Sequence, residues 1–191
     1  MAEKKISAVS LKQLFYGPVI EDPEFSGAKL YALLHPSSDD PTFHEIENVH
    51  QDTWTYEEAE ASVTSYKNQI TGNTYREDRE AGDVAINFTI GLYQYQEKKD
   101  LQGGDLVTGS GSEVVGWKRG SGAQDIKKAL VAKTKDDVWI VLPKASIGAR
   151  GADTDGAIGL AVAGTMMESD VSGVAPEYWF DDSEVKGSPG A

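Results

Sequence analysis

Residues 156–168 alternate bulky and small side chains, and this pattern constrains the fold more than any other part of the chain. The even positions carry Ile158, Leu160, Val162 and Met166. The odd positions carry Ala157, Gly159, Ala161, Ala163 and Thr165. Because successive side chains of a β-strand point to opposite faces, the pattern predicts a strand with one bulky apolar face, which belongs in a core, and one nearly bare face. Small side chains let another backbone approach closely, so we expect Ala157, Gly159, Ala161 and Ala163 to pack against another copy of the chain.

Two long extended runs, residues 54–66 and 74–90, precede this segment. The Glu and Ala residues of the first run would also suit a helix. Gly72-Asn73 lies between the runs and is a typical hairpin turn, so we predict a long β-hairpin centred near Gly72. Within the second run, residues 84–90 alternate in the manner of a half-buried strand. Further strands are predicted at residues 29–34, 113–118, 126–132, 138–142 and 176–180, and residues 125–133 would also fit a helix.

Residues 93–101 are the best helix candidate, and Gly103-Gly104 would end that helix. We predict loops at residues 35–41, 109–112 and 148–156, an N-terminal arm or first strand at residues 1–27, and a disordered tail at residues 183–191. No tandem repeat is present, so residues 1–191 are expected to form a single domain. The predicted fold class is mainly β: a β-sandwich or barrel with a long β-hairpin and one or two short flanking helices.

Composition excludes several classes of protein. The chain has 191 residues, a formal net charge of −13 and no cysteine, which excludes disulfides, thiolate metal ligands and cysteine nucleophiles. A chain with this much negative charge should not bind a phosphate backbone. The charge either keeps the protein soluble or forms a surface that faces nucleic acid without binding it. No apolar run approaches the length of a membrane span, and the first residues lack the apolar region of a secretory signal, so we expect neither.

Candidate catalytic and metal-binding motifs are weak. The three histidines, His35, His44 and His50, lie near Asp39, Asp40, Glu45, Glu47 and Asp52, but they lack the spacing of a helical zinc motif. Asp153-Thr-Asp155-Gly156 resembles the start of a calcium loop, yet position 164 is glycine where the loop needs glutamate, so we interpret it as a turn. No Gly-x-Ser-x-Gly element is present. We therefore expect no enzymatic activity, no metal and no cofactor.

The four tryptophans offer the main alternative function. Trp54, Trp117, Trp139 and Trp179 would line a sugar-binding face if they lay together. Tryptophans spread one per strand are more often anchors of a core or an interface. A carbohydrate-binding or adhesive β-sandwich is thus the alternative to a protein that assembles with copies of itself.

Three stretches together resemble phage major tail tube proteins: residues 82–91 after a hairpin, Gly103-Gly104 after a short helix, and residues 155–164 leading to residues 177–180. The resemblance implies a compact β-barrel or sandwich that forms hexameric rings, which stack into a tube. Strands of all subunits would join into one inner barrel around an acidic channel for DNA. It further implies synthesis in the host cytoplasm, a place in the virion tail, and as partners other copies, other tail proteins and transiently passing DNA. A contractile or non-contractile tail, and a phage or an injection-system relative, all fit it.

The predicted hairpin carries the acids expected to face such a channel. They are Glu57, Glu58, Glu60, Glu77, Asp78 and Glu80. The hairpin is the best candidate for wall strands, and carboxylates on the wall would repel the phosphate backbone of passing DNA. If the hairpin lies outside a tube, the same acids serve only solubility.

Overall fold

The computed structural model describes residues 5–36 and 41–186, and it is mainly β with two short helices, as the sequence predicts. Its main sheet runs in the order β2-β1-β9-β10-β11-β6-β3, and β12 pairs with β10 beside this path. The strands of this sheet are β1 (Leu11–Gly17), β2 (His44–Glu45), β3 (Thr55–Glu58), β6 (Val84–Ile90), β9 (Ile126–Thr134), β10 (Val138–Thr154), β11 (Ala157–Met166) and β12 (Tyr178–Asp181).

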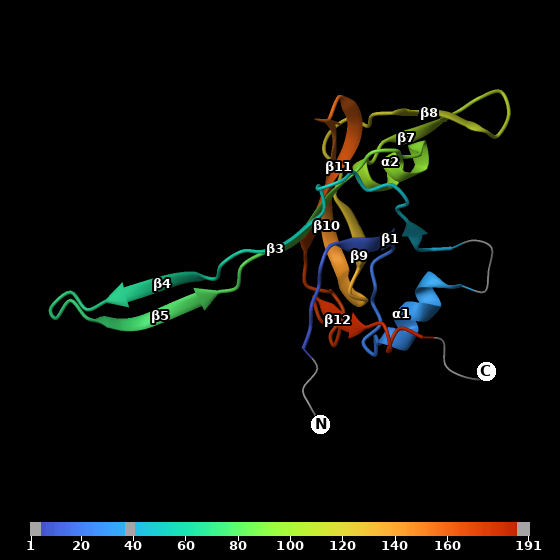
Figure 1. Cartoon of the computed structure of the whole chain (residues 1–191). Coiled ribbons are helices and arrows are strands. Elements are labelled where there is room, and N and C mark those ends of the chain that lie inside the picture. The colour runs from blue at the N-terminus through green and yellow to red at the C-terminus, as the bar shows by residue number, and fades with distance from the viewer. Residues whose placement is uncertain (1–4, 37–40, 187–191) are drawn as a thin grey trace.

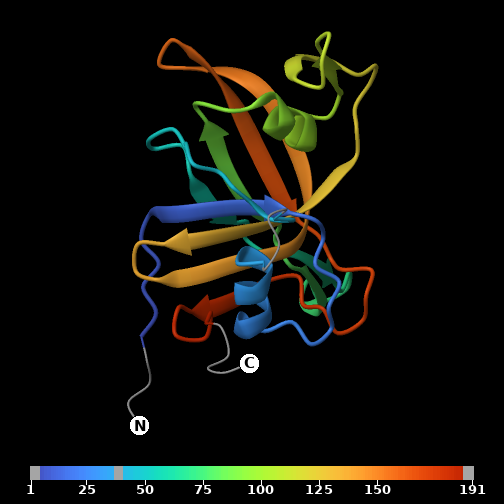
Figure 2. The same cartoon turned by 90° about the vertical axis from the view of Figure 1, so that its right-hand side faces the viewer.

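The long strand β10 belongs to two layers of the fold. Its residues 138–142 lie between β9 and β12, whereas its residues 145–154 pair with β11. The register shifts between Leu142 and Ala145, where the strand passes from one layer to the other. We call β1, β9, β12 and the first part of β10 the lower sheet, and β3, β6, β11 and the second part of β10 the upper sheet. Figure 2 shows the upper sheet rising above the lower one.

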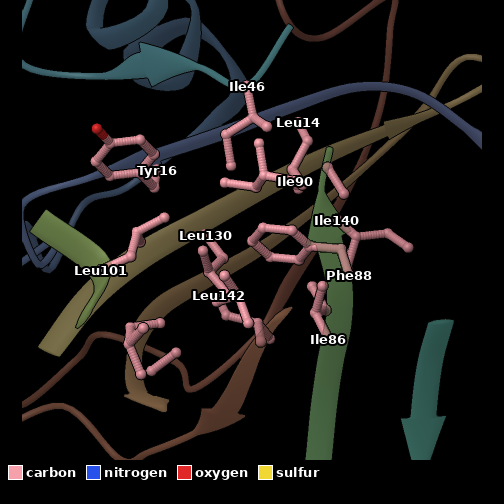
Figure 3. Packing of buried hydrophobic residues seen from close by; sticks show 14 of the residues in the cluster. Leu14, Tyr16, Ile46, Ile86, Phe88, Ile90, Leu101, Leu130, Ile140 and Leu142 are labelled. Carbon is pink, nitrogen blue, oxygen red and sulfur yellow. The ribbon is translucent and has the colours of Figure 1, made fainter. Parts of the chain in front are cut away.

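The main core lies between these two sheets. It is built from fully buried side chains of several strands, which Figure 3 shows meeting around Phe88: Leu14, Ile86, Ile90, Leu130, Ile140 and Leu142. A second cluster lies on the other side of the lower sheet, where Phe15, Val131 and Trp139 pack with Leu30 of α1 (Gly27–Leu34). Because both of its faces are covered, the lower sheet carries continuous apolar runs instead of alternation.

The helices confirm one prediction and correct another. Helix α2 (Tyr95–Gln102) lies within a residue or two of the predicted segment; a reciprocal capping box of Gln94 and Glu97 begins it, and Gly103, with φ of 80°, ends it. Residues 29–34, predicted as a strand, belong to helix α1. Leu30, Leu33 and Leu34 are spaced by three and four residues, so a helix brings all three onto the second cluster.

Strand β11 confirms the alternation in residues 156–168. Leu160 and Val162 are buried in the main core, and Met166 packs against it. Ile158, on the same face, is 74% exposed, because the end of the β10–β11 hairpin extends past the core. The loop predicted at residues 148–156 is wrong: β10 continues to Thr154, and a two-residue turn follows. Asp155 and Gly156 have φ of 51° and 83°, the positive values that a type I′ turn requires.

The predicted long hairpin is present and projects from the body of the protein (Figure 1). Its outer part consists of β4 (Ser62–Lys67) and β5 (Thr74–Glu80), and the chain continues through irregular residues into β3 and β6. At this junction a Cβ on Gly82 would lie 1.8 Å from the carbonyl oxygen of Ala59, so only glycine fits. A smaller hairpin of β7 (Asp105–Thr108) and β8 (Val114–Lys118) closes around the predicted loop at residues 109–112.

The described parts of the two chain ends differ from the predicted N-terminal arm and disordered C-terminal tail. Residues 5–10 have no regular structure and lead into β1, the first strand. In the predicted disordered tail, residues 187–191 lie outside the described residues. Residues 183–186 contradict the prediction, because they form turns that place Val185, 6% exposed, in the second core cluster.

Candidate assembly interface

Among the described residues, the upper sheet has an unpaired edge on each side. Strand β3 pairs with β6 on one side, and among the described residues its other edge has no backbone partner. At the opposite end of the sheet, β9 leaves β10 after Ile147. Within the part of the chain that the structure describes, residues 148–154 of β10 therefore pair with β11 alone. Exposed edges such as these invite pairing with another strand.

One face of the upper sheet packs on the main core, and the other is built of small side chains. We call the latter the small face. Directly opposite residues of neighbouring strands share a face, and the ladders place these residues on it: Thr55, Glu57, Ala85, Asn87, Thr89, Ser146, Gly148, Arg150, Ala152, Thr154, Ala157, Gly159, Ala161, Ala163 and Thr165. Glu57 and Arg150 are the charged members of this set.

The predicted small residues of β11 all belong to the small face, but their exposure differs. Ala157 and Ala163 are exposed and Ala161 is half-buried. Gly159 is buried, and a Cβ there would lie 2.6 Å from Cγ2 of Thr89. Their predicted packing against another copy stays a prediction.

The six predicted lumen acids do not share one face. Glu57 lies on the small face, whereas Glu58, opposite Val84, lies on the other face of β3. Glu60 is exposed between β3 and β4. In the hairpin, the alternation of β5 places Asp78 and Glu80 on one face and Glu77 on the other. A single wall can therefore contain only some of these acids.

The histidines do not come together. His35 Nδ1 contacts the Tyr31 carbonyl oxygen at 3.1 Å, the ring of His44 lies 5.4 Å from that of Tyr16, and His50 Nε2 lies 3.0 Å from Asp155 Oδ2. Asp39 and Asp40 lie outside the described residues. In residues 5–36 and 41–186, no three His, Asp or Glu side chains are placed to hold a metal ion.

The tryptophans are also dispersed. Trp139 is buried beneath α1, and half-buried Trp54 packs against the main core. Trp117 donates its Nε1 proton to the carbonyl oxygen of Gly103 at 2.7 Å and contacts Lys98, at the α2 end of the molecule (Figure 1). Trp179, 39% exposed, meets Tyr56 edge to face. Nothing in this distribution favours the sugar-binding alternative.

Several side-chain hydrogen bonds connect the C-terminal segment, residues 167–186, to the sheets, and the sequence did not predict them. Buried Lys144 donates to Asp170 at 2.6 Å, and Lys133 donates to Asp182 at 2.6 Å. These hydrogen bonds hold the pKa of both carboxyl groups below its ordinary value. Next to the open edge of β3, the hydroxyl of Tyr56 donates to Glu177 at 3.0 Å. Burial, and then this hydrogen bond, raises the pKa of Tyr56. Such partners lie far apart in the sequence, which offers no local signal for them.

Comparison with known proteins gives no family assignment. No family model matches the chain, and no curated protein sequence matches it significantly. In the described part of the chain, neither helix has the length and apolar character needed to cross a membrane. The geometry of the upper sheet and the resemblance of residues 82–91 and 155–164 to tail tube proteins are therefore the available indications of function.

Proposed function

We propose that this protein is a structural subunit that assembles edge to edge into rings, which stack into a tube for DNA delivery of the phage-tail type. The observation that carries the proposal is the pair of open edges on the upper sheet. One edge, β3, and the other, residues 148–154 of β10, belong to different ends of one sheet, so each copy offers two different edges. A contact between unlike surfaces continues from copy to copy and closes into a ring when the rotation allows it.

Strand direction supports this mode of contact. Each neighbouring pair in the order β10-β11-β6-β3 is antiparallel, so β3 runs opposite to β10. Copies related by rotation about a ring axis keep their strand directions. Strand β3 of one copy would therefore meet β10 of the next as an antiparallel pair and extend the same sheet.

The channel in such a ring would be lined by the small face, because the main core and the lower sheet cover the opposite face. This wall has short side chains, and its charged members in the described part of the upper sheet are Glu57 and Arg150. Exposed Lys127 of β9 lies opposite Ser146 on the same face. The wall offers no cluster of cations for a phosphate backbone, so DNA would pass without being held. The low cation content, and not a continuous acidic lining, is the property we propose for the wall.

The test is assembly of the purified full-length chain. Sedimentation velocity over a wide range of concentration, followed by negative-stain microscopy, should reveal rings or tubes with a central channel. A chain that stays monomeric at millimolar concentration contradicts the proposal. Deleting residues 54–59 would remove the open edge of β3; such a variant, if it keeps its cooperative unfolding, should not assemble.

A further inference from the structure

In the described part of the chain, the small face carries two charges without a partner, at opposite ends of the upper sheet. Glu57 lies on the open edge of β3 and Arg150 lies on the open part of β10. Both side chains reach solvent, and within the described part of the chain neither has a hydrogen-bond or ion-pair partner. Charged residues on an open edge commonly prevent unwanted pairing. Opposite signs on two unlike edges, however, also make those edges complementary.

We propose that Glu57 of one copy pairs with Arg150 of the next copy, and that this ion pair sets the register of the edge-to-edge contact. The inference rests on the proposed ring. Both residues lie on the same face of the extended sheet, as an ion pair between neighbouring strands requires. The open edge of β3 in one copy thus binds the open part of β10 in a second copy of this chain.

The offset between the two residues fits a closed ring. Following the ladder from Glu57 leads through Ala85 and Thr165 to Ser146, four residues before Arg150. Pairing Glu57 with Arg150 therefore displaces each copy by four residues along the strands. At about 3.3 Å per residue and about 4.8 Å per strand, this displacement over four strands corresponds to a strand tilt of about 35°. Closed barrels have strand tilts of roughly 35–45°, so this register is one that a ring can adopt.

The neighbouring residues in this register are compatible with close contact. Tyr56 would lie opposite Gly151, Thr55 opposite Ala152, and Glu58 opposite Ala149. The residues on β10 are small, so the backbone of β3 can approach it. No two like charges lie opposite each other across the contact. A shift of register by one residue would move Arg150 and Glu57 to opposite faces.

Charge reversal tests the pair in the full-length protein. The variants are Glu57→Arg, Arg150→Glu and the double variant, with Glu58→Arg as the matched control, because Glu58 is exposed on the same strand but faces the other way. Each single reversal places like charges together and should raise the concentration for half-assembly at least about tenfold, as measured by sedimentation. The double variant should return to within about threefold of the wild type, and the control should stay there. Unchanged melting temperatures of the dilute proteins would show that folding is intact.

An equimolar mixture of the two single variants provides a second readout. In a ring where the variants alternate, position 57 of the Glu57→Arg variant meets position 150 of the Arg150→Glu variant, and these two side chains are again opposite in charge. The remaining contacts are of wild-type kind, so the mixture should assemble where each variant alone does not. Single variants that assemble like the wild type, or a double variant as impaired as the single ones, overturn the ion pair while leaving ring formation in place. A wild-type chain that never assembles overturns the ring itself, and with it the pair.

Discussion

Truncation of Leu160 and of Ile158 to alanine should have very different effects, although both lie on the same face of β11. Leu160 is fully buried, whereas Ile158 is 74% exposed at the end of the β10–β11 hairpin. Removal of a buried leucine side chain costs roughly 2–5 kcal/mol, because the contacts are lost and a cavity remains. An exposed change usually stays within about 0.5 kcal/mol. For a domain of this size, a loss of about 1 kcal/mol corresponds to about 2–4 °C in melting temperature.

Leu160→Ala should therefore lower the melting temperature by about 6–12 °C if it costs about 3 kcal/mol. Ile158→Ala should lower it by no more than about 2 °C. The assay is thermal unfolding followed by circular dichroism, at a concentration where sedimentation shows a monomer. Equal shifts for the two variants would refute the conclusion that the core ends between these residues. A larger effect of Ile158→Ala in assembled samples alone would instead place Ile158 in a contact between copies.

Three further predictions concern the junction, the hairpin and the C-terminal segment. Gly82→Ala should cost about 1–3 kcal/mol in urea unfolding, because its Cβ would meet the carbonyl oxygen of Ala59, whereas Gly148→Ala, whose Cβ would meet no atom closer than 4.0 Å, should be nearly neutral. Replacing residues 60–81 by a short turn should leave the melting temperature of the body unchanged, because β4 and β5 are almost wholly exposed; a large loss would reveal an unseen contact. The depressed pKa values of Asp170 and Asp182 mean that their contribution to stability is complete above about pH 4 and is lost below it as they are protonated. Protection factors for amide hydrogen exchange in residues 167–186, which correct for the intrinsic dependence of exchange on pH, should therefore fall only below that pH. Asp182→Asn should already lower these protection factors at pH 7.

Local patterns in the sequence predict the inner strands of the upper sheet, β6 and β11, but they miss the second part of β10 and do not show which edges stay open. The alternation in residues 84–90 and 157–166 reflects one covered face, so it identifies β6 and β11 directly. A short apolar run suits a helix or a strand equally, so residues 29–34 do not reveal α1 by composition, and the spacing of Leu30, Leu33 and Leu34 is the available signal. The glycines of residues 148–156 favour a loop, yet Asp155-Gly156 is itself a strong signal for a two-residue hairpin turn.

Local sequence patterns cannot predict the candidate interface, for a different reason. Which edge stays open depends on where β9 leaves β10 and where β3 ends, and both are set by pairing between distant residues. Arg150 therefore has no distinguishing feature in the sequence, and Glu57 is one acid among six. The resemblance to tail tube proteins suggests assembly, but the position of the two charges on a common face requires the ladders of the folded sheet.

The order of strands along the chain also has a consequence for synthesis. Strand β6 is made long before β11, its partner in the upper sheet, because Ile90 pairs with Leu160. At about 5–20 residues per second, the ribosome needs roughly 4–14 s to add the residues between them. Until then, β3 and β6 have no sheet to extend, so a growing chain cannot offer the edge that would bind a finished neighbour. On a message translated by many ribosomes at once, this delay would keep neighbouring nascent chains from joining before each has folded.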